Sequence, residues 1–248
     1  MSRLHHRVDG PAGAPVLVLA NSIGTTHELW DPQIEAFVEH FRVVRYDQLG
    51  HGRSEVPPGP YTVELLGREL LALLDELGID RFSFCGLSLG GAVGQWLAGT
   101  EAGRVDRLVL AGTAAYLGPP ERWSDRAQLV RQQGLAEVAA GSAERWFTPD
   151  FGNWVHWRDG IAATPAEGYA ACCDALRDWD FRDELDSIAA PTLVVVGDED
   201  PATTPDDARF LADNIPDAKL VVIPHARHLV NVEQPEAFSA PVLDHLLG

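Results

Sequence analysis

The pentad G-L-S-L-G at residues 86–90 is the part of the chain best suited to chemistry. A serine hydroxyl becomes a nucleophile when a base removes its proton, and flanking glycines permit a sharp turn that lifts the serine clear of a sheet. The apolar run 82–87 and the small residues after the serine predict a strand, a tight turn and a helix. A chance match in a glycine-rich chain is the alternative, and this context counts against it. We therefore predict that Ser88 is a nucleophile, with the Leu89 backbone N–H near the developing oxyanion.

A base and an acid for this serine are expected in loops that follow strands, because active groups of an open α/β sheet gather at the carboxyl ends of the strands. The loop after the apolar run 192–196 offers the acids Asp198, Glu199 and Asp200. The loop after residues 219–223 offers the histidines His225 and His228. The order serine, acid, histidine is that of hydrolases with a nucleophile elbow.

Within each loop, the sequence distinguishes less clearly between the candidate acids and between the candidate histidines. Asp200 precedes a proline that stiffens the loop, whereas the other two acids could be solvated surface groups. His228 precedes the apolar pair 229–230, which could anchor it, whereas the other histidine directly follows the strand. We favour Asp200 as the acid and His228 as the base.

The elements that position these residues alternate between apolar strands and amphipathic helices. Strand-like runs occupy residues 4–9, 16–20, 41–46, 82–87, 105–110, 192–197 and 219–223. Helical spacing of apolar residues occupies 27–40, 62–77, 206–214 and 235–247, and a helix also follows Ser88. This alternation predicts an α/β fold with a mostly parallel sheet of about seven strands and helices on both faces.

Residues 114–187 interrupt the alternation. They carry five of the seven tryptophans of the chain and no strand-like run. We predict that 114–187 is a helical lid inserted into a single core formed by residues 1–113 and 188–248.

The acidic composition bears on partners and substrate. The 248 residues include 19 basic and 37 acidic side chains, for a formal charge of −18. Such a surface repels nucleic acid and anionic membranes, so we expect neither as a partner, and an anionic substrate would need local positive charge. The sequence has no basic and apolar leader and no cysteine–histidine cluster with metal spacing, so we expect a cytoplasmic protein without metal or cofactor. The oligomeric state is left open.

Several stretches resemble the α/β-hydrolase superfamily and, more narrowly, the 3-oxoadipate enol-lactonases of aromatic degradation. They are L-A-N-S-I-G-T-T (19–26), L-W-D-P-Q (29–33), R-Y-D-Q-L-G-H-G-R-S (45–54), F-C-G-L-S-L-G-G (84–91), R-W-F-T-P-D-F (145–151), A-T-P-A-E-G-Y-A-A-C-C (163–173) and A-R-H-L-V-N-V-E-Q-P (226–235). The elbow at 84–91 is shared by the whole superfamily, and the two lid stretches and N-S-I-G-T are more specific. The resemblance runs from about residue 4 to the end of the chain.

The resemblance implies a reaction and a set of roles. Carried over by motif, Ser88 is the nucleophile, Asp200 the acid and His228 the base, and the backbone N–H groups of Ile23 and Leu89 form the oxyanion hole. The implied activity is hydrolysis of 3-oxoadipate enol-lactone to 3-oxoadipate through an acyl-enzyme, with no cofactor.

Residues that read the substrate are expected in the lid and in the N-S-I-G-T loop. A substrate carboxylate in so acidic a protein calls for an arginine, whose planar fork binds it bidentately. Seven arginines lie in or beside the lid: Arg122, Arg126, Arg131, Arg145, Arg158, Arg177 and Arg182. We favour Arg131 or Arg145, because both lie in the lid and Arg145 adjoins Trp146, the tryptophan expected to face the substrate. Asn21 and Ser22 complete the expected set.

The chain departs from the family pattern in three places. Family members usually begin with a strand before residues 4–9, so we expect the sheet to lack that first edge strand. Leu49 stands where the pattern D-x-R-G-H-G has an arginine, and residues 151–161 are short and rich in aromatic side chains. These departures bear on substrate choice. His51 lies in the same loop as Leu49 and faces the site if that loop does.

Two other functions remain open. One is a carboxylesterase or cofactor-free perhydrolase that acts on small esters. The other is a non-catalytic protein that keeps the fold for ligand sensing. A haloalkane dehalogenase is disfavoured because the elbow carries Ser88 rather than aspartate.

Overall fold

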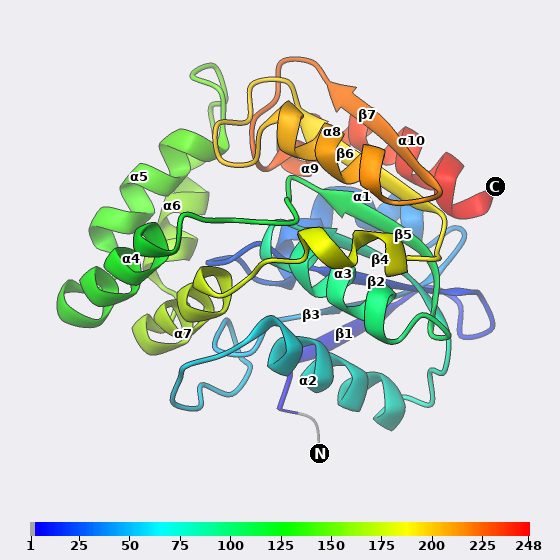
Figure 1. Cartoon of the computed structure of the whole chain (residues 1–248), viewed down its shortest axis with the longest axis horizontal. Coiled ribbons are helices and arrows are strands. Elements are labelled where there is room, and N and C mark those ends of the chain that lie inside the picture. The colour runs from blue at the N-terminus through cyan, green and yellow to red at the C-terminus, as the bar shows by residue number, and fades with distance from the viewer. Residues whose placement is uncertain (1–2) are drawn as a thin grey trace.

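A seven-stranded sheet organises residues 3–248, the part of the chain that the computed structural model describes (Figure 1). The strands are β1 (His6–Asp9), β2 (Val16–Ala20), β3 (Arg42–Tyr46), β4 (Phe82–Leu87), β5 (Val105–Ala111), β6 (Thr192–Gly197) and β7 (Ala218–Ile223). Their order across the sheet is β1-β3-β2-β4-β5-β6-β7. β1 runs antiparallel to β3, and the other neighbours in this sheet are parallel. The predicted mostly parallel sheet of about seven strands is confirmed.

The register of the central strands brings their carboxyl ends to one edge of the sheet. Ala20 at the end of β2 pairs with Gly86, and Leu87 at the end of β4 pairs with Ala111 at the end of β5. All six residues of β4 are buried, as expected of a parallel strand covered on both faces. The loops after β2, β4 and β5 therefore leave the sheet side by side.

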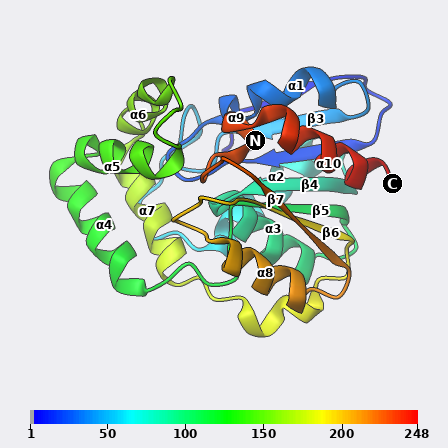
Figure 2. The same ribbon diagram turned by 90° about the horizontal axis from the view of Figure 1, so that it is seen from above.

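Helices cover both faces of this sheet. They are η1 (His27–Trp30), α1 (Asp31–Phe37), α2 (Val63–Glu76), α3 (Leu89–Thr100), α8 (Pro205–Asn214), α9 (Val230–Glu233) and α10 (Pro235–Leu247). α1 packs against α10 on one face of the sheet. α2 packs against α3 on the other face, where α8 also lies (Figure 2). None of the helices in residues 3–248 combines the length and the apolar composition needed to span a bilayer.

The helix boundaries differ from the prediction in two places. The segment 27–40 divides into the 3-10 helix η1 and the helix α1, because Pro32 stands in the first turn of α1. Proline favours a helix start, since it has no N–H to donate to the preceding turn. α9 was not predicted, because four residues are too few to show a helical period.

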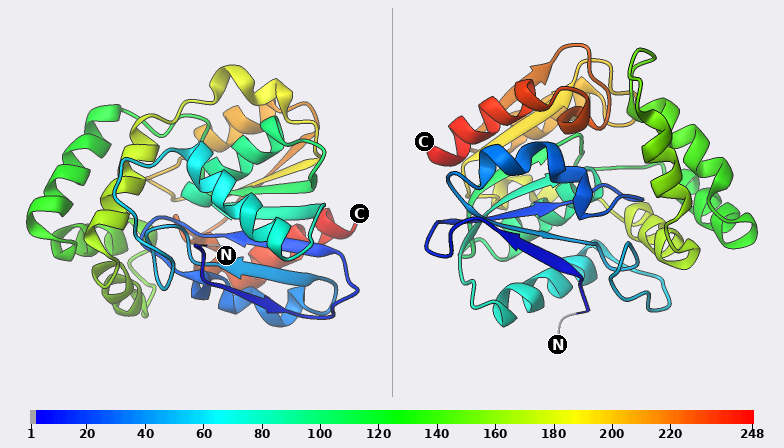
Figure 3. Two further views of the ribbon diagram at one scale, coloured as in Figure 1. Left: turned by 90° about the horizontal axis from the view of Figure 1, so that it is seen from below. Right: turned by 180° about the vertical axis from the view of Figure 1, so that it is seen from behind.

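The segment between β5 and β6 is helical. It contains α4 (Pro120–Gln133), α5 (Ala136–Trp146), α6 (Trp154–Ala162), α7 (Ala166–Arg177) and the 3-10 helix η2 (Arg182–Ser187). α4 packs against α7 and α5 against α6. In both views of Figure 3, α4–α7 form a group on the side of the molecule opposite the C-terminus. A single bridge between Tyr116 and Asp180 joins the two ends of the segment.

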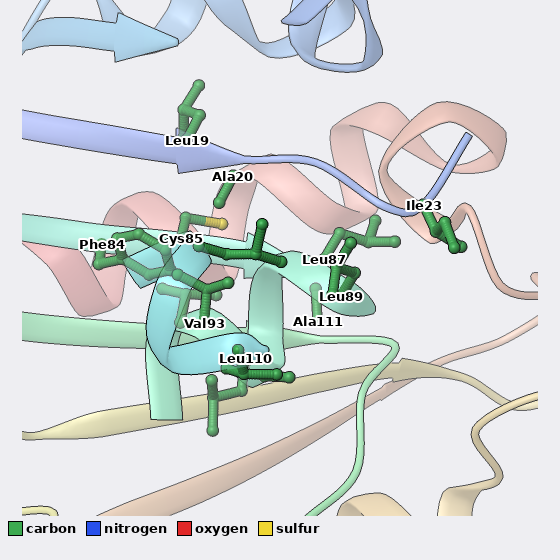
Figure 4. Close-up of a cluster of buried hydrophobic side chains, with 14 of the residues drawn as sticks. Leu19, Ala20, Ile23, Phe84, Cys85, Leu87, Leu89, Val93, Leu110 and Ala111 are labelled. Carbon is green, nitrogen blue, oxygen red and sulfur yellow. The ribbon is translucent and has the colours of Figure 1, made fainter. Parts of the chain in front are cut away.

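The buried core continues up to the turn that follows β4. Figure 4 shows Leu19 and Ala20 of β2 beside Phe84, Cys85 and Leu87 of β4, among further buried side chains of β5 and α3. Each of these five side chains is fully buried. The turn therefore rests on closely packed apolar side chains that fix its position.

Candidate active site

Ser88 occupies the apex of a strained turn between β4 and α3. Its backbone has φ 57° and ψ −112°, a conformation that residues other than glycine rarely adopt. Two hydrogen bonds hold the turn: the Ser88 N–H donates to the Ala111 carbonyl at 2.9 Å, and the Gly90 N–H donates to the Asn21 carbonyl at 3.0 Å. Strain of this kind persists where the surrounding structure enforces it, typically at functional sites.

The two glycines of the pentad are required by close backbone approach. A Cβ on Gly86 would lie 2.2 Å from the Gly90 carbonyl oxygen. A Cβ on Gly90 would lie 2.4 Å from the carbonyl oxygen of Ala20. The pattern that drew attention to Ser88 thus has a steric cause in the contact between α3 and the neighbouring strands.

A second group of polar residues forms from the loops after β6 and β7. The ring of His228 donates from Nδ1 to Asp200 Oδ2 at 2.9 Å, and both side chains are buried. The Thr203 hydroxyl donates to the same Oδ2 at 2.7 Å. The backbone N–H groups of Ala202 and Thr203 donate to Oδ1 at 2.8 and 3.1 Å. Asp200 is thereby held against His228 from both sides.

These hydrogen bonds keep the Asp200 carboxyl ionised. Burial raises its pKa, but the attraction to His228 and the donors of His228, Thr203 and Ala202 outweigh burial, so the pKa lies below its ordinary value. An ionised Asp200 requires the His228 proton on Nδ1, which leaves Nε2 with a free lone pair. Thr203 was missed by sequence reasoning, although its place three residues after a candidate acid is typical of a turn.

The other candidates in these loops lie outside the group. Asp198 and Glu199 are exposed. The His225 side chain is 86% exposed and lies 4.0 Å from Glu199. The structure therefore brings together the acid and the histidine that we favoured, and neither of their neighbours.

The loop after β2 approaches Ser88 with Ile23. No hydrogen bond of the Ile23 or Leu89 backbone N–H is found within residues 3–248. The next residue, Gly24, donates its N–H to His51 Nε2 at 2.9 Å. Burial lowers the pKa of His51 to about 4, so the ring is neutral and Nε2 accepts. His51 therefore fixes the loop beside Ile23 rather than exchanging protons.

Ser88, His228 and Ile23 line one cavity together with side chains of the helical segment. The free space is about 30 Å³. The side chains contributed by α4 and α5 are two tryptophans and three arginines: Trp123, Trp146, Arg122, Arg126 and Arg145. The Trp146 ring lies 6.2 Å from the ring of His228.

The three arginines form a cationic wall, a term we use for Arg122, Arg126 and Arg145. None of them forms an ion pair with a carboxylate in the part of the chain that the structure describes. Burial and repulsion from Arg126 lower the pKa of Arg122, and burial and repulsion from both neighbours lower that of Arg145. The guanidinium carbons of Arg122 and Arg126 lie 5.4 and 5.0 Å from the Trp123 ring centre. Three positive charges are thus held close together with no ion-paired carboxylate within residues 3–248, which is costly unless an anion binds.

Arg131 is not brought to this cavity. Its guanidinium pairs with Glu167 at 3.1 Å and with Asp174 at 2.7 Å on α7. Arg145 does line the cavity, and its role toward a substrate carboxylate stays a prediction. Arg122 and Arg126 line it too, although they were among the seven candidates and were not favoured. Their spacing of four residues around Trp123, which puts both on one helix face, is the signal that could have selected them.

Asn21 and Ser22 do not line this cavity. Asn21 donates from Nδ2 to the Tyr46 carbonyl at 2.6 Å and so ties the loop to β3. The Ser22 hydroxyl is buried and has no hydrogen-bond partner within residues 3–248. Both residues support the loop that carries Ile23.

A separate cluster elsewhere has the residue types of a metal site. Ligand atoms of His5, His27 and Asp47 lie within 4.8 Å of one another. Asp47 Oδ1 already accepts from the His27 N–H at 2.9 Å and pairs with His27 Nδ1 at 2.8 Å, and Oδ2 accepts from the Arg53 N–H at 2.9 Å. These bonds account for the cluster as a support of the loop after β3, away from Ser88.

Comparison with known proteins gives one family and several similar chains. Residues 17–240 match the family described as Alpha/beta hydrolase family. A curated relative, 3-oxoadipate enol-lactonase 2 of Acinetobacter baylyi, is 43% identical over 96% of this chain and 91% of its own.

Two solved structures are similar along almost the whole chain. A hydrolase from Pseudomonas aeruginosa is 46% identical, with a TM-score of 0.95 over 98% of this chain and 94% of its own. The enol-lactonase from Burkholderia xenovorans is 43% identical, with a TM-score of 0.96 over 99% of this chain and 96% of its own. The match therefore includes both the sheet and the helical segment.

Proposed function

The chain belongs to the alpha/beta hydrolase family, and from this premise we propose that it hydrolyses 3-oxoadipate enol-lactone to 3-oxoadipate. The observation that carries the proposal is the shared cavity, which Ser88 and His228 line together with three arginines that form no ion pair within residues 3–248. A serine nucleophile suits an ester or lactone carbonyl, and the cationic wall suits a substrate with a free carboxylate. Relatives at 40 and 43% identity that bear the name 3-oxoadipate enol-lactonase support the choice of lactone.

In the proposed first step, His228 Nε2 takes the proton of the Ser88 hydroxyl while the oxygen attacks the lactone carbonyl. The ionised Asp200 holds the His228 ring in orientation and stabilises the imidazolium that forms. The backbone N–H groups of Ile23 and Leu89 would donate to the tetrahedral oxyanion. Neither group has to break a hydrogen bond within residues 3–248 to do so.

Collapse of the tetrahedral intermediate opens the ring. The bond between the acyl carbon and the ring oxygen breaks, and the leaving enol receives the proton held by His228. The enol remains attached to the acyl-enzyme through the opened chain, and its tautomerisation to the ketone makes ring closure unfavourable. Water, deprotonated by His228, then attacks the acyl carbon, releases Ser88 and leaves a keto diacid.

We further propose that residues 114–187 act as a lid over this site. Trp123, Trp146 and the cationic wall all come from α4 and α5, which lie in this segment. The catalytic groups come from the loops of the core, formed by residues 1–113 and 188–248. On this proposal the core carries out the reaction and the lid selects the substrate.

The test is hydrolysis of 3-oxoadipate enol-lactone beside a neutral p-nitrophenyl ester, with the purified protein. We expect kcat/KM for the lactone to exceed that for the ester. Preference for the ester would favour a carboxylesterase, and formation of a peracid from the ester when hydrogen peroxide is added would favour a cofactor-free perhydrolase. Binding of the lactone with no turnover of either substrate would favour a ligand-sensing protein.

A further inference from the structure

The cationic wall carries more charge than one carboxylate requires. Arg122, Arg126 and Arg145 line the same small cavity, and no carboxylate of residues 3–248 neutralises them through an ion pair. The other lid arginines form ion pairs with acidic side chains, as Arg131 does with Glu167 and Asp174. Within the segment 114–187, the arginines that form no ion pair in residues 3–248 are therefore the three that line the cavity of Ser88, in a protein whose overall charge is −18.

Hydrolysis in this cavity would raise the negative charge of the bound molecule. The ester bond of the lactone breaks, an acyl carbon–oxygen bond to water forms, and the new carboxylic acid releases a proton at neutral pH. A lactone with one carboxylate thus becomes a diacid with two. The second carboxylate would form beside Ser88, in the cavity that Ile23 and His228 also line, and the N–H groups of Ile23 and Leu89 have no hydrogen-bond partner within residues 3–248.

We propose that this cavity is a binding site for short dicarboxylates, which bind more tightly than singly charged ligands of the same length. One carboxylate pairs with the cationic wall and the other occupies the place of the oxyanion. The preference for anions follows from the charges of the cationic wall, whereas the second carboxylate and the identity of the natural diacid rest on the proposed function. The expected consequence is competitive inhibition by the diacid product.

Product inhibition of this kind places the reaction in a sequence. A hydrolase that retains its diacid works at full rate only while another enzyme removes that diacid. The consuming reaction is therefore expected to act on a free short-chain keto diacid. The rate of lactone hydrolysis would then depend on how fast that enzyme removes the diacid, because the diacid occupies the cavity.

The first test uses the unaltered protein. Hydrolysis of p-nitrophenyl acetate, a neutral ester, is measured in the presence of adipate, hexanoate or adipamide, which have six carbons and carry two, one and no charges. We expect competitive inhibition by adipate with a Ki at least tenfold below that of hexanoate, and weaker inhibition by adipamide. Equal Ki values for adipate and hexanoate would overturn the proposal.

The second test assigns the effect to the cationic wall. Arg122→Gln, Arg126→Gln and Arg145→Gln are each expected to raise the adipate Ki about tenfold, while Arg131→Gln leaves it unchanged because that side chain is ion-paired outside the cavity. A rise in Ki with Arg131→Gln as large as with Arg145→Gln would contradict the assignment. Thermal unfolding of each variant identifies any loss of fold.

The outcomes separate this inference from the proposed function. Tight adipate binding without lactone turnover would leave the dicarboxylate site standing and remove the lactonase proposal. Lactone turnover together with equal Ki values for adipate and hexanoate would support the lactonase proposal and remove the dicarboxylate site. Titration of adipate into Ser88→Ala by calorimetry repeats the comparison without any turnover.

Discussion

At the scale of single residues, the proposed chemistry depends on one hydrogen bond and one backbone conformation. Ser88 is fixed at φ 57° by the turn, and Asp200 is fixed to His228 by a 2.9 Å hydrogen bond. The G-L-S-L-G pentad indicated Ser88. The loops after β6 and β7, and the residues next to each candidate, indicated Asp200 and His228. Their catalytic roles stay predictions, and each can be tested separately.

Removal of the Ser88 hydroxyl is expected to abolish turnover. Ser88→Ala should lower kcat by about 10³-fold or more, because no other residue supplies the nucleophile. The measurement is steady-state hydrolysis of the best substrate, with circular dichroism to show that the fold persists. A variant with a tenth of the original activity would exclude Ser88 as the nucleophile.

The three acids after β6 should differ sharply in their effect. Asp200→Asn should reduce kcat by roughly 10⁴-fold, because an amide no longer fixes the tautomer of His228. Asp198→Asn and Glu199→Gln are the matched controls, since both side chains are exposed, and each should retain most of the activity. Similar losses in all three variants would remove the assignment of Asp200.

At the scale of elements, the loop that carries Ile23 is stabilised by a neutral histidine from another loop. Folding lowers the pKa of His51 from 6.5 to about 4, so between these values the unfolded chain binds a proton that the folded chain does not. Stability from this residue is therefore present above pH 6.5 and is lost as the pH falls towards 4. The full loss corresponds to about 3 kcal/mol.

His51→Gln should flatten this dependence. Glutamine has a carbonyl that can accept from Gly24 and no group that titrates in this range. We expect the difference in the free energy of unfolding between pH 7 and pH 5 to be about 2 kcal/mol smaller in the variant. Urea denaturation at the two pH values measures it, and His40→Gln, at an exposed position, serves as the control. Identical pH dependence in the His51 variant and the original protein would contradict the role given to His51.

At the scale of the whole molecule, features set by local sequence patterns could be predicted, whereas features set by tertiary contacts could not. The strand-like runs predicted each strand to within two residues, and the central strands were clearest because buried parallel strands are continuous apolar runs. The choice of arginine could not be made in the same way. Arg131 is neutralised by Glu167 and Asp174, which follow it by 36 and 43 residues, and only the packing of α4 on α7 brings them together.

The size of the Ser88 cavity has a kinetic consequence. The free space of about 30 Å³ is small for a lactone, so we expect α4, α5 or the side chains that they carry to move when a substrate enters. Encounter of the lactone with the protein and its access to Ser88 are then separate steps. The rate of the second step depends on how often the lid opens. Reagents that modify serine should report this: methanesulfonyl fluoride should inactivate the protein at least tenfold faster than the larger phenylmethanesulfonyl fluoride. Inactivation by the larger reagent should reach a limiting rate at high concentration, and that limit would be the opening rate of the molecule itself.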